Sequence, residues 1–378
     1  MKVYDKKIYV SDFLRFAKRK IGNIFMCILF FTSSVQLIAQ KQMPNEKAFC
    51  FYYNWYGNTT FDGSEIHWAH EIMKQKPSDP DLHRIPGKEN LASNFYPELG
   101  NYSSNDPEIV SKHMKMMADS RIGVVILTWW RKSDSGLKAI PIIMDEAQKV
   151  GLKVCFHLEP YGGRNAKTVR EDIENLLKEY GDHPAFYRME GKACFFIYDS
   201  YLTKAEEWAT LLQSDGAITI RNTPLDAIVI GLWVKQGEEA FFRKSGFDGY
   251  YTYFGATNFT YGSSPANWPY MQKWAVENNK IFIPCVGPGY IDTRVRPWNG
   301  KTTRDRENGM YYDRMFKAAI DCGASYIGIT SFNEWHEGTQ IEPAVAFECH
   351  EFKYLDYNPL APDYYLKRTA YWIEKLKK

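Results

Sequence analysis

The chain has 378 residues, of which 45% are hydrophobic and 24% charged, so it can bury a sizeable core. Its 47 basic and 45 acidic residues give a formal charge of +2, and no long block of like charge appears along it. This balance argues against nucleic acid as a partner, because proteins that bind nucleic acid concentrate basic residues on one face.

The first 39 residues have the pattern of a secretory signal peptide. Basic residues precede an apolar run over residues 24–31, and apolar residues continue to Ala39. Leu37 is large for its position before a cut after Ala39, so an uncleaved N-terminal anchor stays open as an alternative. We therefore predict export to the periplasm or cell surface of a bacterium, with membrane contact only if this segment is not cleaved.

Beyond the leader, eight short β-type runs alternate with helical patterns. This alternation predicts βα units around a parallel sheet, and eight is the strand number of a barrel. We therefore predict an α/β fold, a single (β/α)8 TIM-type barrel, over residues 44–378. The expected strands cover residues 48–53, 123–128, 153–158, 193–197, 227–232, 249–253, 281–286 and 326–331. The expected helices cover residues 107–120, 137–150, 166–180, 204–214, 238–245, 266–278, 308–321 and 362–377.

The connection after the first predicted strand, residues 54–105, is too long for an ordinary βα loop. Long ordered insertions at this face of a barrel usually carry function, so we expect this one to form a wall of a substrate site. The helix that follows has an orthodox start, with Asp106 as cap, Pro107 in the first turn and Glu108 as an early acid.

The cysteine pattern predicts buried thiols and not a disulfide framework. Four of the seven cysteines fall inside predicted strands, where they behave as small apolar residues. They are Cys50, Cys155, Cys194 and Cys285.

Polar and aromatic side chains follow almost every predicted strand. The carboxyl ends of barrel strands face one end of the barrel, so these side chains are expected to gather at one rim, where barrel enzymes keep their active sites. Some of the aromatic residues could instead only cap strands or pack loops. The residues at strand ends include Trp55, Tyr56, Trp130, Glu159, Tyr198, Trp233, Phe254, Tyr290, Asn333 and Glu334.

Glu334 and Glu337 lie three residues apart just after the last predicted strand. Paired carboxylates are the usual equipment for cleaving a glycosidic bond. One of them must keep its proton, which needs a pKa raised by burial or by a neighbouring negative charge. If the segment begins a helical turn, their spacing favours retention of anomeric configuration over inversion. The alternative is that one is a structural acid paired with Arg294 or Arg296.

Three further polar residues are candidates for the same site. Glu159 directly follows a predicted strand and could bond sugar hydroxyls, with a structural role as the alternative. His67 and His70 raise the question of a metal, but their spacing is not that of the zinc proteases, and His336-Glu337 has no second histidine at the required interval. We therefore predict no metal and no cofactor, and we expect both histidines to bond hydroxyls at the site or to pack loops.

A set of longer motifs spans nearly everything after residue 48. They cover residues 51–58, 61–63, 67–70, 95–100, 156–161, 183–188, 246–249, 286–293 and 331–342. On these motifs the chain resembles glycoside hydrolase family 99, the endo-α-1,2-mannosidases and endo-α-1,2-mannanases.

The resemblance implies a metal-free barrel enzyme that cuts within an α-mannoside chain and retains configuration. In this family the substrate's own 2-hydroxyl attacks C1 to form a 1,2-anhydro sugar. By position, Glu334 would be the base for that hydroxyl, and Glu337 the general acid that later activates water. Proton transfer of this kind contributes about 10²–10⁴-fold, so loss of either residue should be severe. The resemblance also implies sugar subsites lined by Tyr56, His67, Trp130, Glu159, Tyr253 and Asn333.

Trp130 bears on the choice of substrate. Animal members that trim glucosylated N-glycans have Trp-Tyr where this chain has Trp129-Trp130, and their tyrosine meets the non-reducing glucose. The larger indole should favour mannose, so we expect a monomeric endo-α-1,2-mannanase whose partner is fungal-type α-mannan or a manno-oligosaccharide. Two alternatives stay open: an endo-α-1,2-mannosidase for glucosylated high-mannose N-glycans, and a non-catalytic carbohydrate-binding barrel. A glycosyltransferase is disfavoured because no nucleotide-binding signature is present.

Overall fold

The computed structural model describes residues 43–83, 90–131, 135–349 and 352–376. Residues 43–378 make up one unit, and the predicted leader over residues 1–39 lies outside the described residues. Within the described part, no helix is both long enough and apolar enough to span a membrane.

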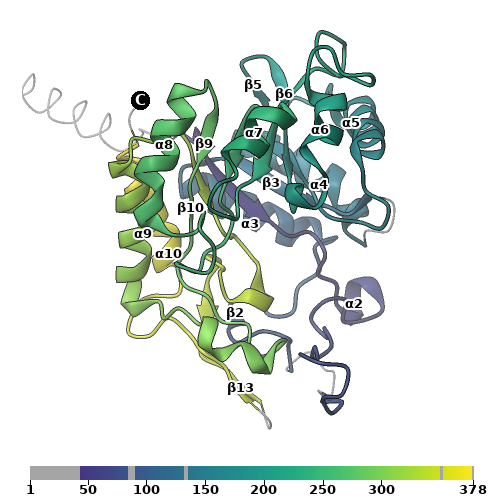
Figure 1. Ribbon diagram of the computed structural model, residues 1–378. Coiled ribbons are helices and arrows are strands. Elements are labelled where there is room, and N and C mark those ends of the chain that lie inside the picture. Colours follow the sequence, from purple (N-terminus) through teal and green to yellow (C-terminus); the bar gives the residue numbers. More distant parts are fainter. Residues whose placement is uncertain (1–42, 84–89, 132–134, 350–351, 377–378) are drawn as a thin grey trace, which may run out of the picture. The chain divides into compact units, whose positions relative to one another are not determined.

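The unit is a parallel α/β barrel, which confirms the predicted fold class (Figure 1). Its sheet runs in the order β10-β11-β1-β3-β4-β6-β7-β8-β9, with a short strand β5 (Arg188–Met189) paired antiparallel to β6. The parallel strands are β1 (Asn45–Tyr52), β3 (Ile122–Trp129), β4 (Lys153–Leu158), β6 (Lys192–Ile197), β7 (Ala227–Leu232), β8 (Gly249–Tyr251), β9 (Ile281–Ile283), β10 (Cys285–Val286) and β11 (Ile327–Ile329).

One predicted strand, residues 281–286, is split in two at Pro284. Proline has no N–H to donate and interrupts a ladder. The first half, β9, pairs with β8, and the second half, β10, pairs with β11. The Pro284 carbonyl still accepts from the Gly328 N–H at 3.0 Å, so the two ends of the sheet meet through this one segment. The ten-stranded sheet therefore contains the eight predicted strands, one of them split, together with β5.

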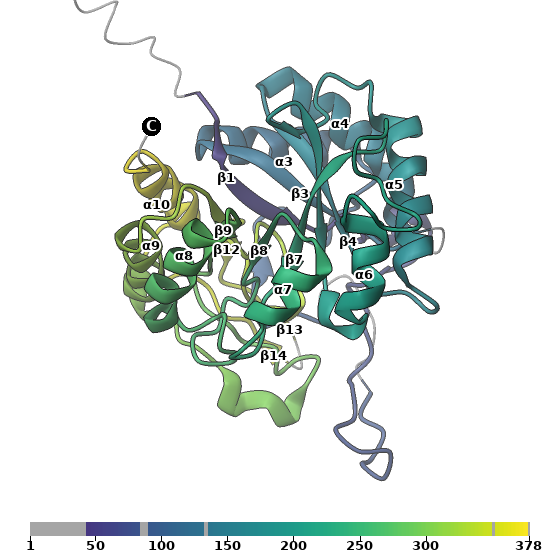
Figure 2. The same ribbon diagram turned by 45° about the horizontal axis from the view of Figure 1, so that its top comes forward.

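Helices cover the outside of the barrel on both sides of the view in Figure 2. In α3 the predicted cap is present, since the Asp106 carboxylate accepts from the Glu108 N–H at 2.9 Å. Its buried face carries Val110, Met114 and Met117 at helical spacing. The helices are α2 (Thr59–Asp62), α3 (Pro107–Asp119), α4 (Ala139–Val150), α5 (Ala166–Tyr180), α6 (Ala205–Leu212), α7 (Glu239–Ser245), α8 (Trp268–Glu277), α9 (Met310–Asp321) and α10 (Tyr364–Ile373).

Aromatic rings fill the inside of the barrel below the site. Phe49 and Phe51 of β1 both contact Phe196 of β6 edge to face, and Phe51 stacks on Tyr251 of β8 with ring centroids 5.8 Å apart. All four side chains are fully buried. The barrel interior is therefore a packed core, and the chemistry is expected at the strand ends above this layer. The four strand cysteines are also buried, as predicted.

The long connection after β1 is ordered over its described residues and lies at one end of the barrel (Figure 1). It contains α2 and a short strand β2 (Tyr96–Pro97), which pairs antiparallel with β12 (Ala344–Val345) from the segment after β11. A third segment joins it, because the Met73 N–H donates to the Val295 carbonyl at 2.8 Å. Two further short strands, β13 (Glu348–Cys349) and β14 (Phe352–Lys353), form a hairpin.

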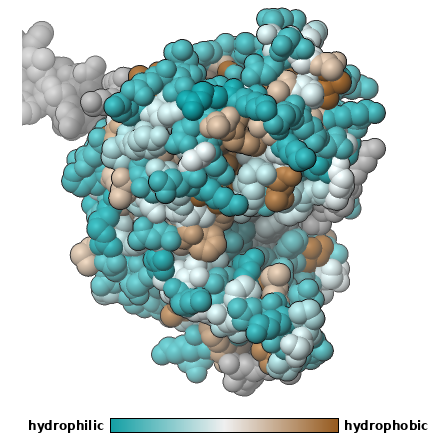
Figure 3. Space-filling view, in the orientation of Figure 1, coloured by the Kyte–Doolittle hydropathy of each residue, from teal (hydrophilic) through white to brown (hydrophobic). Residues whose placement is uncertain are grey.

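The outer surface is mostly hydrophilic on the face shown in Figure 3, with small separate hydrophobic areas. Large apolar side chains are also exposed in the segments after β1 and β10, among them Met73, Leu82 and Trp298. These three side chains line one shallow cavity.

Candidate active site

The two candidate carboxylates flank one short turn after β11. Glu334 is the cap of the 3-10 helix η7 (Trp335–Glu337), and Glu337 is its last residue. A 3-10 helix aligns positions three apart, so the local structure places both carboxylates on one side of the turn. The Glu334 N–H donates to Ser331 Oγ at 2.8 Å, and its Oε1 accepts from the His336 N–H at 3.2 Å. The helical turn that the sequence argument set as its condition is present over these residues.

Burial sets the protonation of this pair. Glu334 is only 4% exposed, and burial raises its pKa well above the ordinary value; the negative charge of Glu337 raises it further, whereas the His336 N–H lowers it. Burial also raises the pKa of Glu337, to about 7, against the lowering effect of Arg296. Glu337 keeps 24% of its side chain exposed. Near neutral pH the pair therefore tends to keep one proton between its two carboxyl groups. Chemistry that needs an acid and a base side by side requires this state.

The alternative, in which an arginine pairs with one of the two acids, holds only weakly and only for Arg296. Arg296 Nη1 lies 3.8 Å from Glu337 Oε1 but closer, 3.1 Å, to Asp292 Oδ2. Arg294 is engaged elsewhere, donating to the Leu91 carbonyl at 3.0 Å. Asp292, fully buried, was missed by the sequence reasoning; it lies in the motif of residues 286–293 and gathers Tyr290, Arg296 and Asn299 around one oxygen.

Glu159 lies at the end of β4 and is 4% exposed. Its Oε1 accepts from Thr128 Oγ1 at 2.7 Å and contacts His157 Nδ1 at 2.8 Å, while His157 Nε2 bonds the Tyr251 hydroxyl at 2.6 Å. Both contacts use one carboxylate oxygen. The charge of Glu159 reaches residues 334–337, the candidate catalytic turn, because it contributes to the raised pKa of both Glu334 and Glu337.

Tyr253 shares a hydrogen bond with the hydroxyl of Tyr53, which follows the last residue of β1. The strand β8 stops at Tyr251, and Tyr253 takes a left-handed conformation with φ of 49°, so the chain turns there. Burial and then the charge of Glu334 raise the pKa of Tyr53, which stays neutral. Tyr53 was missed as a site residue, although it sits in the motif of residues 51–58.

Asn333 and Tyr56 hold the catalytic turn. The Asn333 amide makes two bonds to the main chain of Tyr53, and Tyr56 donates its hydroxyl proton to the Asn333 carbonyl at 3.1 Å. The Trp335 N–H in turn donates to the Tyr56 hydroxyl at 3.2 Å. Both side chains are buried, at 0% and 1% exposure. Because the polar groups of both side chains bond the protein main chain, both residues stabilise the position of the turn.

The long loop after β1 places its two histidines beside His336 of the turn. His67 stacks on Trp55 with ring centroids 4.6 Å apart, and its carbonyl lies 2.9 Å from His336 Nε2. The rings of His70 and His336 are 5.1 Å apart. Burial lowers the pKa of His67 to about 4, so it is neutral at pH 7.

Trp130 follows β3 and also reaches this group of rings. Its ring centroid lies 6.5 Å from that of Trp55, which itself stacks on His67. Among the described residues, no three His, Cys, Asp or Glu side chains are grouped as metal ligands would be.

A buried polar network supports the turn from below. Glu342 is fully buried and accepts from Trp335 Nε1 at 3.0 Å and from the Tyr102 hydroxyl at 2.8 Å. Its other oxygen contacts His113 Nε2 of α3 at 3.1 Å, and His113 Nδ1 bonds the Tyr52 hydroxyl. Trp335 stands between the two candidate acids, so this network fixes the backbone that carries them. In the sequence, the only signal for this network is that Glu342 lies in the motif of residues 331–342.

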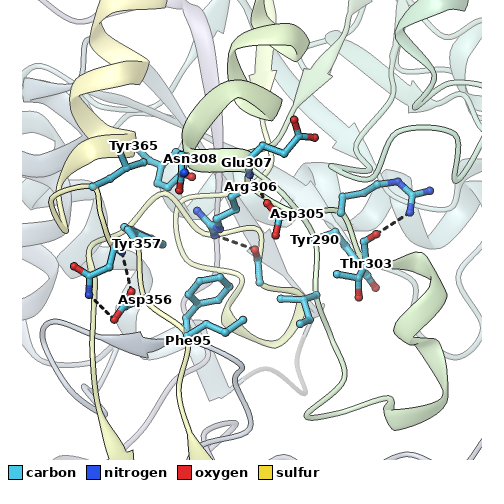
Figure 4. A pocket seen from close by; sticks show the side chains of 16 residues that line it. Phe95, Tyr290, Thr303, Asp305, Arg306, Glu307, Asn308, Asp356, Tyr357 and Tyr365 are labelled. Atoms are coloured by element: carbon cyan, nitrogen blue, oxygen red, sulfur yellow. Dashed lines mark hydrogen bonds between the residues drawn. The ribbon is translucent and has the colours of Figure 1, made fainter.

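Arg306 holds the far side of the same turn. Its Nη2 donates to the Gly338 and Gln340 carbonyls at 2.9 and 2.8 Å, beside a cavity of about 200 Å³ (Figure 4). Its Nε and Nη1 are buried and meet no hydrogen-bond acceptor among the described residues. The guanidinium instead lies 4.6 to 4.7 Å from three ring centroids, whose negative faces stabilise a cation. These rings are Phe95, Tyr357 and Tyr365.

A (β/α)8 barrel with two neighbouring carboxylates at its carboxyl-terminal rim, one buried and one partly buried, has the construction of a glycoside hydrolase. The model of the family described as glycosyl hydrolase family 99 matches residues 44–378, and the chain belongs to this family.

Curated proteins and solved structures agree with this assignment. The chain is 45% identical over 345 residues to the glycoprotein endo-alpha-1,2-mannosidase of Rattus norvegicus, covering 87% of this chain and 74% of that protein. It is equally identical, over 350 residues, to that of Xenopus laevis, covering 89% and 78%. The structure of the GH99 endo-alpha-mannosidase from Bacteroides thetaiotaomicron superposes with a TM-score of 0.86 at 58% identity, covering 88% of this chain and 98% of that one.

Proposed function

We propose that the protein is an exported, retaining endo-acting glycoside hydrolase that cleaves internal α-1,2-mannosidic bonds of fungal-type α-mannan. The observation that carries the proposal is the pair Glu334 and Glu337 on one turn, where the charge of Glu337 raises the pKa of Glu334, in a chain of this family. A pair that keeps one proton near neutral pH supplies an acid and a base at once.

In this reaction Glu334 is the base for the 2-hydroxyl of the bound sugar and Glu337 is the acid. The His336 N–H already favours the ionised form of Glu334, and a sugar hydroxyl that donates to Glu334 favours it further. In this proposal, substrate binding therefore lowers the pKa of Glu334 and leaves the proton on Glu337. The pKa of Glu337, about 7, suits a group that gives a proton to the leaving oxygen and takes one from water later. The 2-hydroxyl oxygen attacks C1 as the glycosidic bond breaks, and water then opens the 1,2-anhydro sugar with retention.

The sugar-contacting residues that we propose lie around this pair. Glu159 and Tyr253 form the floor above the aromatic core, and His67 and Trp130 come from the loops after β1 and β3. His70 lies beside His336 at the same rim. Asn333 and Tyr56 act mainly by holding the turn, because their polar groups bond the protein main chain.

The preference for mannan rests on Trp130. An indole fills more of the subsite for the non-reducing sugar than a phenol does. Mannose and glucose differ there only in the configuration at C2, and we expect the larger ring to favour mannose. A second candidate, trimming of glucosylated high-mannose N-glycans, is favoured by the 45% identity to glycoprotein endo-alpha-1,2-mannosidases.

The test compares yeast α-mannan with a glucose-capped manno-oligosaccharide on the purified enzyme, its Glu337→Gln variant and its Trp130→Tyr variant. Faster cleavage of mannan by the wild type, lost in Glu337→Gln, supports the proposal. Trp130→Tyr should move the preference toward the glucose-capped substrate. Faster cleavage of that substrate by the wild type would establish the second candidate, and binding without cleavage would establish a carbohydrate-binding barrel.

Export is a separate part of the proposal, and the pattern of residues 1–39 supports it. N-terminal sequencing of the protein recovered from a bacterial host tests it. A mature chain that begins at Gln40 indicates a cleaved signal peptide. An intact leader in the membrane fraction indicates an anchor, and an intact leader in the cytoplasm overturns export.

A further inference from the structure

Trp298 is unusual for a tryptophan in this barrel because 42% of it is exposed. It lies in the 3-10 helix η5 (Pro297–Thr302) and lines a shallow cavity of about 190 Å³ together with residues of the long loop after β1. Met73 and Leu82 of that loop are also exposed, at 40% and 52%. Gln75 and Asp79 stand in the same cavity and add polar groups beside the apolar ones.

This cavity is tied to the catalytic turn by short connections. Arg296, two residues before Trp298, lies 3.8 Å from the carboxylate of Glu337. On the other wall, the Met73 N–H bonds the Val295 carbonyl at 2.8 Å, so the long loop and the segment of Trp298 are joined. Asn299, the next residue, donates to the buried Asp292 at 2.9 Å and fixes the start of η5.

The order of the strands indicates on which side of the carboxylate pair this cavity lies. Around the sheet the neighbours run β10, β11, β1, β3. The carboxylate pair follows β11, Trp130 follows β3, and Trp298 follows β10. The strands that precede Trp130 and Trp298 therefore lie on opposite sides of the strand that precedes the pair. In the proposed function, a sugar chain with its non-reducing end at Trp130 and its cleaved bond at Glu337 has its leaving-group portion on the side of the pair where Trp298 lies.

We propose that Trp298, with Met73 and Leu82, forms a distal subsite that binds mannose residues of the leaving-group portion of an α-mannan chain. The inference rests on the proposed function and adds where a polymer is held beyond the cleaved bond. The occupant is the sugar chain itself.

The chemistry of the cavity fits a sugar. The indole offers a flat apolar face to the C–H face of a pyranose, and Gln75 and Asp79 offer an amide and a carboxylate to its hydroxyls. Exposed apolar side chains that cluster beside polar groups mark binding sites more often than isolated ones do. Tyr270, with 48% exposure, differs because it lies on the outer helix α8 and bonds Glu239 there.

The experiment measures kcat and KM for Trp298→Ala on two substrates. One is a long α-1,2-manno-oligosaccharide or mannan, and the other is a manno-oligosaccharide with a single mannose beyond the cleaved bond. We expect kcat/KM on the long substrate to fall about three- to tenfold, mainly through KM, because one aromatic contact is lost. The short substrate should be cut as fast as by the wild type. Trp298→Phe, which keeps a flat ring, should recover part of the loss.

Tyr270→Ala is the matched control, since it removes a similarly exposed aromatic ring from helix α8, where its hydroxyl bonds Glu239 and the ring lines no part of this cavity. This variant should leave kcat and KM unchanged on both substrates. Equal loss on both substrates in Trp298→Ala, or no loss on the long one, overturns the subsite. A change in oligomeric state on size-exclusion chromatography would also overturn it, because the cavity would then be an interface between copies of this chain.

A binding measurement tests the distal subsite independently of the proposed catalytic activity. Calorimetry of the long manno-oligosaccharide compares Glu337→Gln with the double variant that also carries Trp298→Ala, and it does not need turnover. If the wild type cleaves neither substrate, the proposed function fails, but weaker binding by the double variant still supports the subsite. If the single and double variants bind the oligosaccharide equally well, the subsite fails and the proposed function stands.

Discussion

Tyr53 and Asn333 are joined by two hydrogen bonds across the gap between β1 and β11. The Tyr53 N–H donates to Asn333 Oδ1 at 2.8 Å, and Asn333 Nδ2 donates to the Tyr53 carbonyl at 2.9 Å. A side-chain amide has the same donor and acceptor as a peptide group, so it continues the pairing of β1 with β11 past the strand ends. The next residue is the candidate base Glu334, whose position is thereby coupled to the barrel wall.

Asn333→Ala should lower both stability and turnover. It leaves a buried N–H and C=O of Tyr53 without partners, which costs about 1–3 kcal/mol of unfolding free energy. Because the turn loses its anchor, kcat should also fall, by about tenfold or more. Urea unfolding and steady-state kinetics on the same preparations measure both effects.

Asn267→Ala is the comparison for this variant. The Asn267 amide also bonds a main-chain carbonyl, that of Tyr261 at 2.8 Å, but it belongs to the segment before α8. It should cost stability alone. An Asn333→Ala enzyme that is destabilised yet keeps the wild-type kcat would show that this anchor does not position Glu334.

The barrel strands and the helices between them are readable from the sequence, because each of these strands is a short apolar run and each of these helices has an amphipathic face. The short elements of the loops, such as α2 and β2, have no such pattern and are not predicted. Glu334 and Glu337 are readable for a similar reason, since one local turn sets their relation. The split at Pro284 is harder, because a continuous apolar run hides which neighbour each half pairs with.

The supporting residues could not be found in the same way. Arg306 looks like a surface cation in a polar segment, and its aromatic surroundings come from Phe95, far earlier in the chain, and from Tyr357 and Tyr365, well after it. Other buried acids, such as Asp292, sit inside motifs, but a motif does not say whether an acid is buried or exposed. Long-range packing decides that, and the sequence pattern carries little information on it.

The pH dependence of turnover should respond in opposite directions to two charge changes beside Glu337. Its raised pKa, about 7, means that the acid loses its proton as pH rises through neutrality, so kcat should fall on the alkaline side. Arg296 lowers this pKa and Asp292 raises it. Arg296→Met should therefore move the alkaline limb to higher pH, and Asp292→Asn should move it to lower pH.

Rate profiles across neutral pH, taken with saturating substrate, check this pair of variants. Arg221→Met serves as the control, because Arg221 also bridges two carboxylates, those of Asp226 and Asp248, but lies among the residues before β7. Its profile should coincide with that of the wild type. If the alkaline limb of the rate profile moves in the same direction in Arg296→Met and in Asp292→Asn, Glu337 is not the group whose titration limits turnover.

Glu337→Gln should stabilise the folded protein at alkaline pH while removing activity. A carboxyl whose pKa is raised from 4.5 to about 7 in the folded state binds more protons there than in the unfolded state between these values, so its presence lowers stability as pH rises. The neutral amide does not carry this cost. At about pH 8 the variant should gain about 1–3 kcal/mol of unfolding free energy over the wild type.

At about pH 4 this gain should largely disappear, because the carboxyl is then mostly protonated in both states. Denaturant unfolding of both proteins at the two pH values measures the difference. A gain of the same size under acidic and alkaline conditions would assign it to packing and not to the charge of Glu337.

Arg306→Lys should reduce kcat by about ten- to hundredfold with a smaller change in KM, because the residues just after Glu337 would be held less firmly. The lysine keeps a positive charge among the three rings, but it cannot match the planar guanidinium that donates to both the Gly338 and Gln340 carbonyls. A misplacement of about 1 Å at a catalytic group is costly. Steady-state kinetics and melting temperature separate this loss from a general loss of stability.

Arg304→Lys provides a matched comparison, because Arg304 also donates to several main-chain carbonyls, including that of Thr257 at 2.9 Å, but contacts no residue of the catalytic turn in its described hydrogen bonds. It should lose stability without a selective loss of kcat. If Arg304→Lys and Arg306→Lys lose kcat in the same proportion to stability, Arg306 only supports the fold. If Arg306→Lys alone loses kcat, the aromatic surroundings of Arg306 serve to fix the carbonyls that follow Glu337.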